Sequence, residues 1–230
     1  MMQKNKKVVI FGTGEIGSLA KFYFDRNSDY LVAGFTADDE FVTAQSIEGV
    51  PLVAFSHVKK FFPPEDFFMH VALSYRKLNQ TRADKYAAAK ALGYRLASYV
   101  CTRSVYWDDL DHGDNCFILE NQTIQPGVRI GNNVMIWSGN HIGHAAVIED
   151  HCYISSHVVI SGHAVIGERS FLGVNSTIKD FVRIGKGSFV TMNACAAKDV
   201  PEGAVVLGAS GKIYGPDTKH AQLFKKKYFT

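Results

Sequence analysis

The stretch NHIGHAAVIEDHCYISSHVVISGHAVIG, residues 140–167, repeats an isoleucine at every sixth position and contains five histidines. The same spacing continues on both sides, so that branched apolar residues stand six apart from Ile118 to Val190. An α-helix cannot keep such residues on one face, because six residues rotate through about 600° and not through two full turns. Three short strands joined by bends can do so, in coils of about 18 residues. The spacing therefore predicts a hexapeptide β-helix.

A second position in each six-residue unit supports this fold. The residues four places after the branched anchors are mostly small, as expected where side chains crowd inside a narrow prism: Val128, Val134, Ala146, Cys152, Val158, Ala164, Ser170, Ser176, Val182, Ser188 and Ala194. Gln122 and Asn140 depart from this pattern. A β-sandwich would reproduce the spacing only by coincidence, and backbone pairing in a β-helix stacks each residue about 4.8 Å above the one 18 later.

The histidines of this stretch avoid both inward positions, which are the first and fifth of each unit. His144 takes the third position, His151, His157 and His163 take the fourth, and His141 takes the sixth. One coil after His144 comes Gly162, which leaves a bare backbone amide beside the imidazole. A neutral imidazole suits a general base near neutral pH, and an amide N–H can hold a developing oxyanion. The alternative is that these are ordinary polar surface histidines.

The first hundred residues follow a different pattern, in which strand-like and helix-like segments alternate. Short apolar runs at 8–14, 31–36, 51–55, 70–74 and 95–100 predict strands, and 18–26 and 78–92 predict helices. Such alternation is typical of a parallel sheet covered by helices. The polar stretch DDLDHGDN, 108–115, marks the change of pattern. We therefore expect a Rossmann-like α/β domain over 1–107, a β-helix over 108–214 and a tail over 215–230.

GTGEIG, residues 12–17, matches the dinucleotide-binding fingerprint between a predicted strand and a predicted helix. Only about 90 residues surround it, which is one mononucleotide-binding half of the full fold. No acidic residue directly ends the second strand, so the sequence argues against an NAD enzyme. Ser74, Tyr75 and Asn79 follow a later strand and are expected at the same crevice. A turn built only for tight packing is the alternative.

Composition excludes several classes of protein. The net charge of +3 is too small to indicate nucleic-acid binding, and we expect Lys225, Lys226 and Lys227 to form a solvated tail. The four cysteines form no CxxC pair, which is typical of reduced thiols in the cytoplasm. No apolar run approaches the roughly 20 residues of a membrane span. These features predict a cytoplasmic protein without membrane insertion.

The segment GNHIGHAAVIEDHCYISSHVVISGHAVIGERSFLGVNSTI, 139–178, resembles the hexapeptide-repeat acyltransferases of the sialic-acid O-acetyltransferase and bacillosamine N-acetyltransferase type. The resemblance covers roughly residues 6–213. It implies a Rossmann-like domain followed by a left-handed parallel β-helix. It also implies transfer of an acyl group, usually acetyl, from coenzyme A to a nucleotide-linked sugar for surface glycans. A homotrimer with its sites between neighbouring β-helices, and no metal, would follow.

The same resemblance assigns roles to particular residues. It implies His144 as the catalytic base, and acyl-CoA contacts from Tyr153, Gly162, Val174 and Met192. It implies that the nucleotide sugar is bound at Thr13, Gly14, Glu15, Asp38, Asp39, Ser74, Tyr75 and Asn79. Acetyl-CoA is then a co-substrate, and the acetyl group passes directly to the acceptor.

Two features depart from that family. Ala145 stands where many members have an acidic residue that orients the base, so Glu149 or a neighbouring chain would have to substitute. The closing motif of the family is replaced by GASG, 208–211. We expect N-acetylation, because an amine needs less help from a base without an acidic partner. The alternatives are sugar O-acetylation, a zinc hydratase resembling the γ-class carbonic anhydrases, and a non-catalytic scaffold.

Overall fold

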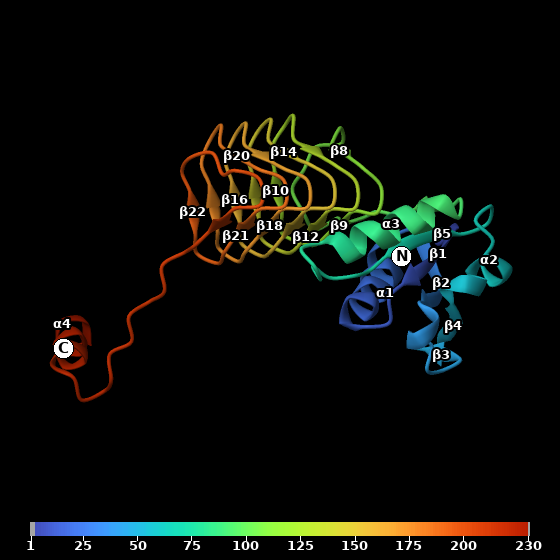
Figure 1. The fold of residues 1–230 in the computed structure, drawn as a ribbon, viewed down its shortest axis with the longest axis horizontal. Helices are drawn as coiled ribbons and strands as arrows, with labels where there is room; N and C mark the ends of the chain where they lie inside the picture. Colours follow the sequence, from blue (N-terminus) through green and yellow to red (C-terminus); the bar gives the residue numbers. More distant parts are fainter. Residues whose placement is uncertain (1–2, 230) are drawn as a thin grey trace.

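The computed structural model describes residues 3–229 and shows an α/β domain beside a β-helix (Figure 1). The strands of the first domain form a six-stranded sheet in the order β3 (Ser46–Ile47), β4 (Val50–Ala54), β2 (Tyr30–Ala37), β1 (Lys6–Phe11), β5 (Phe68–Val71) and β6 (Arg95–Leu96). All pairs are parallel except β3 with β4. The order reverses at β1, so a crevice forms where the carboxyl ends of β1 and β5 diverge.

The first domain also contains helical segments, of which α1 and α3 are the longest. Its helical segments are α1 (Glu15–Asn27), η1 (Asp39–Phe41), η2 (Phe55–His57), α2 (Val58–Phe61) and α3 (Gln80–Ala91). Helix α3 ends before Gly93, whose φ of 92° is in the left-handed region. This confirms the helix end that the sequence predicts.

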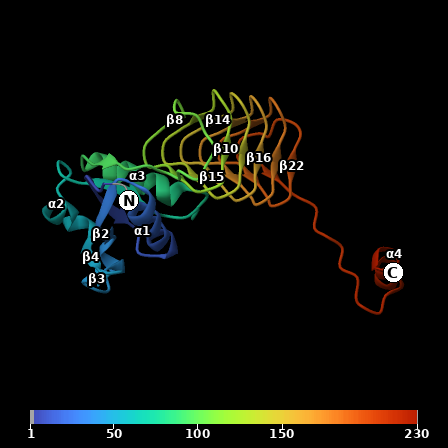
Figure 2. The ribbon, with the colours of Figure 1, turned by 180° about the vertical axis from the view of Figure 1, so that it is seen from behind.

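The second part is a left-handed parallel β-helix whose coils are stacked in Figure 1 and are seen from behind in Figure 2. One sheet contains β7 (Tyr99–Val100), β9 (Phe117–Ile118), β12 (Met135–Ile136), β15 (Tyr153–Ile154), β18 (Phe171–Leu172), β21 (Phe189–Val190) and β23 (Val205–Val206). The next contains β10 (Thr123–Ile124), β13 (His141–Ile142), β16 (Val159–Ile160), β19 (Thr177–Ile178) and β22 (Cys195–Ala196). The third contains β8 (Asp111–His112), β11 (Arg129–Ile130), β14 (Val147–Ile148), β17 (Val165–Ile166) and β20 (Arg183–Ile184).

The interior of the β-helix is made of the predicted anchors. All the positions six apart from Ile118 to Val190 lie in one buried cluster, together with small residues such as Ala146 and Ala164. Gln122 and Asn140 also point inward, and both are buried. Their amides are satisfied locally: each donates to the carbonyl of Trp137. The departures from the small-residue rule are therefore hydrogen-bonded core residues.

We name the three sheets by their outward residues. The aromatic face carries Phe117, Met135, Tyr153, Phe171 and Phe189; the uncharged face carries Thr123, His141, Val159, Thr177 and Cys195; the charged face carries Asp111, Arg129, Val147, Val165 and Arg183. The chain runs from the aromatic to the uncharged to the charged face in each coil. Three corners follow: the groove corner after the aromatic face, the histidine corner after the uncharged face, and the covered corner after the charged face.

The fourth position of each unit has a left-handed backbone. Positive φ values recur every six residues, including Asn133, His151, His163 and Asn175 with φ between 55° and 65°. Asparagine and histidine are among the non-glycine residues that tolerate this conformation. The turn conformation therefore accounts for three of the five histidines in the opening stretch, His151, His157 and His163, independently of any chemistry.

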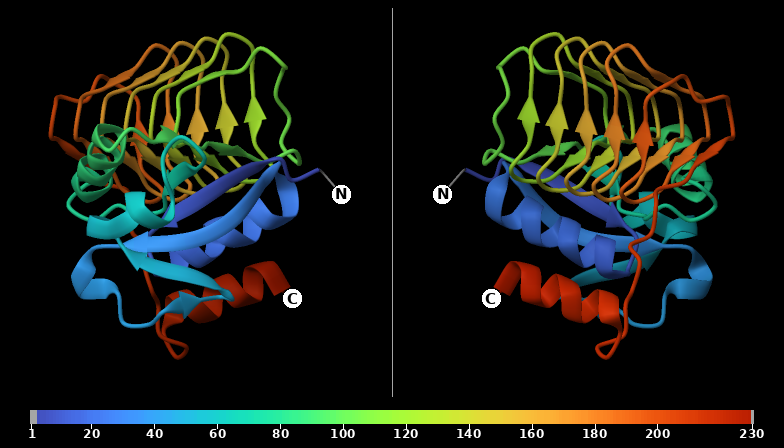
Figure 3. Two further views of the ribbon diagram at one scale, coloured as in Figure 1. Left: turned by 90° about the vertical axis from the view of Figure 1, so that its right-hand side faces the viewer. Right: turned by 90° about the vertical axis from the view of Figure 1, so that its left-hand side faces the viewer.

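The α/β domain packs on the aromatic face at the first coils. Phe117, Met135 and Tyr153 share a buried cluster with Phe24, Phe35 and other residues of the first domain. The expected strand 95–100 is divided at this point: β6 completes the first sheet, whereas β7 pairs with β9 of the β-helix. Views along the long axis show the first domain below one side of the coils (Figure 3). The chain thus enters the β-helix directly from the α/β sheet.

The C-terminal segment leaves the body of the molecule. After β23 the chain runs outward and ends in α4 (Lys219–Phe229), which lies apart from the coils in Figures 1 and 2. Tyr214 stacks on His220 at the start of this helix, with ring centroids 5.0 Å apart. Lys225, Lys226 and Lys227 are exposed, as expected, but they belong to helix α4.

Candidate functional site

The imidazole of His144 lies at the histidine corner, directly over Gly162 of the next coil. A Cβ placed on Gly162 would come within 2.6 Å of Cε1 and 2.9 Å of Nε2 of His144. Any side chain at position 162 would therefore displace the ring. His144 itself is exposed, as the sequence predicts for the third position of the unit.

The Gly162 amide is available beside this ring. The ladder of backbone hydrogen bonds includes the neighbouring Ser161 and His163 amides, which donate to Ile178 and to His144. Within residues 3–229, the Gly162 N–H has no acceptor. An unpaired amide in a buried backbone is costly unless something outside the chain accepts its hydrogen bond. The structure thus places an imidazole and an unpaired backbone amide together, at the two positions that the sequence singles out.

Gln125 and His163 contact His144, and Phe181 packs behind His163. The register places His163 beside His144, whereas Gln125 and Phe181 were not foreseen. The Oε1 atom of Gln125 accepts the His144 amide at 2.8 Å and lies 3.3 Å from Nδ1 of the ring. His163 packs edge-on against His144, with centroids 5.0 Å apart. Phe181, 71% exposed, stacks on His163 at 4.9 Å. Their sequence spacing could have indicated this, because each of these residues lies 18 or 19 positions, or one coil, from the next.

The predicted acyl-CoA residues Tyr153, Val174 and Met192 line an apolar hollow at the groove corner. Its volume is about 480 Å³, and Trp137, Ser155, Ser156, Phe171, Gly173 and Phe189 complete the lining with Tyr75 of the first domain. Val174 and Met192 are exposed, whereas Tyr153 is buried. The hydroxyl of Tyr153 accepts a hydrogen bond from Trp137, and burial raises the pKa of Tyr153 to about 12. Tyr153 therefore offers a neutral ring stacked on Phe171.

His144 and Gly162 lie at a different corner from Tyr153, Val174 and Met192. The uncharged face separates the two corners along each coil. Within one chain, the predicted base and most of the predicted acyl-CoA contacts are therefore not brought together. Glu149, the suggested substitute for the missing acidic residue, accepts the Glu168 amide at 2.9 Å on the charged side of the prism and has no bond to His144.

The crevice of the α/β domain brings together part of the predicted acceptor set. Thr13, Gly14, Asp38 and Ser74 line a cavity of about 230 Å³ at the carboxyl ends of the strands. Phe41, Arg76 and Lys85 also line it and were not foreseen. Lys85 pairs with Asp38, with Nζ and Oδ1 2.5 Å apart. Lys85 belongs to α3, 47 residues after Asp38, so no local sequence motif predicts this ion pair.

The remaining predicted acceptor residues lie outside that cavity. Glu15 is exposed at the start of α1, and Asp39 bonds the Ser56 hydroxyl, a contact that holds the pKa of Asp39 below its ordinary value. Tyr75 packs edge-on against Tyr153 in the groove-corner hollow. Asn79 is fully buried and donates to the Arg169 and Ser170 carbonyls. Asn79 thus joins the two domains and has no surface to offer a ligand.

The glycine turn is shaped by packing at two of its three glycines. A Cβ on Gly12 would meet the Ala72 carbonyl oxygen at 2.6 Å, and one on Gly17 would meet the Gly12 oxygen at 2.0 Å. Gly14, in contrast, faces open space. Gly12 and Gly17 therefore serve close packing, while Gly14 borders the crevice. The turn combines the packing role with a surface that is open to a ligand.

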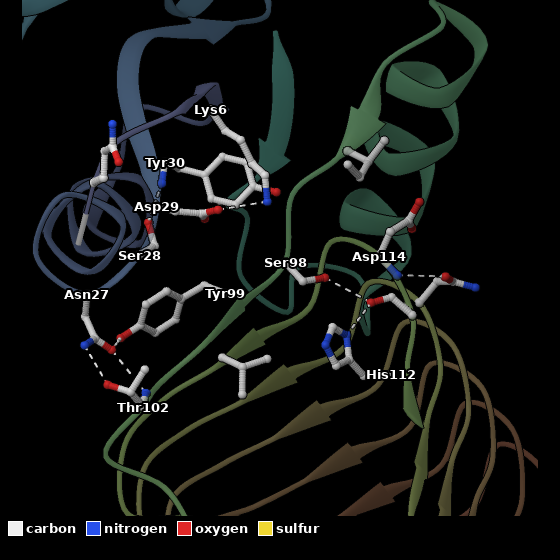
Figure 4. A pocket seen from close by; sticks show the side chains of 15 residues that line it. Lys6, Asn27, Ser28, Asp29, Tyr30, Ser98, Tyr99, Thr102, His112 and Asp114 are labelled. Carbon is white, nitrogen blue, oxygen red and sulfur yellow. Dashed lines mark hydrogen bonds and ion pairs between the residues drawn. The ribbon is translucent and has the colours of Figure 1, made fainter. Parts of the chain in front are cut away.

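A larger cavity, of about 870 Å³, lies at the opposite edge of the sheet where the first domain meets the first coils (Figure 4). Its polar groups are largely bonded to one another. Lys6 pairs with Asp29 at 2.8 Å, the Tyr99 hydroxyl donates to Asn27 at 2.9 Å, and Ser98 donates to the Gly113 carbonyl. We regard it as the crevice of the domain junction.

Comparisons with known proteins identify the repeat. Residues 111–144 and 127–162 match the model described as bacterial transferase hexapeptide (six repeats), and 163–195 match the hexapeptide repeat of succinyl-transferase. Residues 111–195 therefore contain hexapeptide repeats. The chain is 33% identical over 103 aligned residues, which make up 42% of its length, to an acyl-[acyl-carrier-protein]–UDP-N-acetylglucosamine O-acyltransferase of Ectopseudomonas mendocina. The chain spans about 40% of the length of that relative.

Solved structures extend the likeness to the α/β domain. The acetyltransferase domain of PglB from Neisseria gonorrhoeae, in complex with acetyl coenzyme A, aligns with a TM-score of 0.78 at 22% identity, over 91% of this chain and 100% of that one. PerB from Caulobacter crescentus, in complex with CoA and GDP-perosamine, aligns with a TM-score of 0.77 at 23% identity, over 91% and 97%. At these identities the likeness establishes the shared two-domain fold around the hexapeptide repeats.

Among residues 3–229, no three His, Cys, Asp or Glu side chains cluster closely enough to hold a metal ion. No helix in that range is long and apolar enough to cross a membrane.

Proposed function

We propose that this chain is an acetyl-CoA-dependent N-acetyltransferase acting on a nucleotide-linked amino sugar for surface glycan synthesis in the cytoplasm. The observation that carries the proposal is the His144 imidazole lying over Gly162, whose amide has no acceptor among residues 3–229. The structural neighbours bound to acetyl coenzyme A and to GDP-perosamine support the two substrates.

The reaction needs one base and one oxyanion donor. The amino group of the sugar attacks the thioester carbon, and His144 takes the proton that this nitrogen loses. The Gly162 N–H donates to the oxyanion of the tetrahedral intermediate. A C–N bond forms, the C–S bond breaks, and coenzyme A leaves as its thiolate. Acetyl passes directly to the acceptor without an acyl-enzyme.

The hollow at the groove corner is proposed to hold the acyl-CoA. Tyr153, Val174 and Met192 give it an apolar surface, which suits the pantetheine arm and its thioester. Because this hollow and His144 lie at different corners of one prism, the proposed complete site requires a second copy of the chain.

The order of the three faces supports a homotrimer. The uncharged face lies between the groove corner and the histidine corner, and its outward residues are Thr123, His141, Val159, Thr177 and Cys195. The two other faces carry charged or large aromatic side chains. If uncharged faces pack around a common axis, the histidine corner of each copy meets the groove corner of the next. Each such interface would contain one base and one acyl-CoA groove.

The acceptor is proposed to bind in the α/β crevice, with its sugar reaching toward His144. Gly14 offers open backbone at the start of α1, where a helix N-terminus favours phosphate. Arg76 and Lys85 add positive charge to the lining formed by Thr13, Asp38 and Ser74. A nucleoside diphosphate fits this combination.

The test is a thiol-release assay with acetyl-CoA against UDP-, dTDP- and GDP-linked amino sugars, with sialic acid as the hydroxyl acceptor. We expect turnover with one of the amino sugars. Replacing His144 by Ala should lower kcat by about 10²–10⁴-fold, the usual contribution of a general base. His112→Ala is the matched control, because His112 is an exposed histidine of β8 at the domain junction whose ring bonds the Gly113 carbonyl.

Three outcomes would contradict the proposal. Normal turnover by the His144→Ala variant would show that His144 is not the catalytic base. Transfer to sialic acid alone would favour the O-acetyltransferase. Absence of acetyl-CoA binding in calorimetry would leave a non-catalytic scaffold.

A further inference from the structure

We propose that Gln125 is the positioning residue of the His144 base and replaces the acidic residue that is missing at position 145. This inference rests on the proposed function and assigns a side chain that the hexapeptide pattern does not single out. It is carried by two hydrogen bonds from His144 to one oxygen atom, Oε1 of Gln125.

The identity of that oxygen is fixed by the backbone. The His144 N–H donates to the Gln125 side chain at 2.8 Å. A backbone N–H can only donate, so the atom facing it must be the amide oxygen and not the amide nitrogen. The same oxygen lies 3.3 Å from Nδ1 of the imidazole.

This oxygen in turn selects the tautomer of the ring. An amide oxygen only accepts hydrogen bonds, so Nδ1 must carry the proton in the neutral imidazole. The lone pair is then on Nε2, which has no hydrogen-bond partner in the described part of the chain. The ring lies over Gly162, with Nε2 2.9 Å and Nδ1 3.0 Å from the position of a Cβ there. Gln125 thus leaves the basic nitrogen unbonded in a ring that lies against Gly162.

Gln125 is itself held firmly. Its backbone N–H donates to the Ile142 carbonyl at 3.0 Å, and the next residue, Pro126, has a restricted φ. Pro126 also accepts the Ala145 amide at 3.1 Å, which pins the turn that carries His144. Ala145 has φ of 54°, and its methyl group cannot accept a hydrogen bond. Orientation of the base therefore depends on the coil before it.

A second residue of the β-helix shows that a carboxylate is compatible with this position. Glu149 and Gln125 each follow the last residue of a strand, and each accepts the backbone N–H of the residue 19 positions later. Glu149 does so as a carboxylate, at 2.9 Å from the Glu168 amide nitrogen. The Gln125→Glu variant should therefore keep the turn while placing a negative charge beside Nδ1.

The experiment compares wild type, Gln125→Ala and Gln125→Glu by two measurements. Long-range ¹H–¹⁵N NMR of the His144 ring reports the tautomer, and the pH dependence of kcat/KM reports the base. We expect a single Nδ1–H tautomer in the wild type and a mixture in Gln125→Ala, with kcat lower by about tenfold or more. In Gln125→Glu, the acid limb of the profile should move to higher pH by about one unit, because a nearby carboxylate favours the imidazolium.

Two results would overturn the inference. One is an unchanged tautomer together with kcat within about twofold of the wild type in Gln125→Ala. The other is an unmoved pH profile in Gln125→Glu. A purely structural role would alter stability only and leave both readouts in place. Failure here is distinguishable from failure of the proposed function: if His144→Ala is inactive while Gln125→Ala behaves as wild type, only the role of Gln125 is lost.

Discussion

The covered corner and the histidine corner of the β-helix are built from the same six-residue unit but have opposite surroundings. His151 and His163 occupy the same fourth position, with φ of 65° and 57°. At the covered corner, His151 bonds Asn133 through Nδ1 at 2.8 Å and packs against Tyr86 of the α/β domain. At the histidine corner, His163 is exposed and packs against His144.

This difference shows that the repeat decides only where an imidazole stands. The repeat fixes the backbone conformation and the outward direction, and the α/β domain decides whether the ring becomes structural. Burial lowers the pKa of His151 and keeps the ring neutral in a polar network. Asn115, Asn133 and His151, each 18 residues from the next, form a continuous chain of side-chain hydrogen bonds there.

The largest effect on the covered side is expected from Arg82 of α3. Its guanidinium is 1% exposed and donates to the carbonyls of Asn133, His151 and Cys152, and also to Asn79. Burial lowers the pKa of Arg82 to about 10. Arg82→Met removes the donor of the Asn133 and His151 carbonyls, whereas the Cys152 carbonyl keeps its bond from the Met135 amide. The free energy of unfolding should fall by about 3 kcal/mol.

Urea unfolding followed by tryptophan fluorescence measures this change, since both tryptophans lie after residue 105. Arg82→Lys serves as the matched variant and should lose less, because the ammonium group keeps the charge and some of the donors. A loss below about 1 kcal/mol in Arg82→Met would mean that the junction does not depend on these bonds.

An effect that reaches a similar size only at acidic pH, and is small near neutral pH, is expected from His70. This residue of β5 is fully buried between the Phe24 and Phe117 rings, and Nδ1 donates to the Ala97 carbonyl at 2.8 Å. Burial lowers the pKa of His70 to about 4. The unfolded chain binds this proton from about pH 6.5 downward, so the folded state loses up to about 3 kcal/mol between about pH 6.5 and 4.

The pH dependence is measured by repeating the urea unfolding at steps from pH 7 to pH 4. His70→Asn keeps a donor for Ala97 but cannot titrate, so its stability should change less across this range than that of the wild type. Parallel curves for the two proteins would show that His70 is not the group responsible.

The smallest effects should separate the two histidines of the comparison. His163→Ala removes the ring that packs on His144, and kcat should fall by about three- to tenfold with little change in stability. His151→Ala removes one bond to Asn133, and the free energy of unfolding should fall by about 1 kcal/mol with kcat nearly unchanged. Steady-state kinetics and urea unfolding of both variants test this. If the two variants exchanged these effects, the distinction between the corners would be wrong.

Much of the fold was predictable because it follows from local repetition. The interior positions from Ile118 to Val190 recur without a gap, and each coil repeats the geometry of the one before. The outward direction of His144 and its position over Gly162 follow from the same register. In the first domain, strands β1, β2, β4 and β5 and helices α1 and α3 were also foreseen. Strand β3, helix α2 and the short segments η1 and η2 were not, and residues 95–100 divide between two sheets.

The parts that sequence reasoning missed depend on contacts between distant segments. Gln125 reaches His144 through a flexible side chain that the register does not orient. Lys85 reaches the crevice from α3, and Arg82 on the same helix binds the β-helix instead. Asn79, expected at the acceptor site, instead bonds the Arg169 carbonyl at the domain junction. Neither periodicity nor motif spacing contains this information, because it arises from how the two domains meet.

Because the uncharged face separates the groove corner from the histidine corner, the number of complete active sites would depend on how many protomers associate. If the proposed function holds, a single protomer would contain two incomplete half-sites: the proposed base without a groove for acyl-CoA, and the proposed groove without a base. Two associated protomers would complete one reaction centre and leave one half of each kind over. Only a closed ring leaves nothing unmatched, so dilution that opens the ring should abolish more turnover than the fraction of protein it releases.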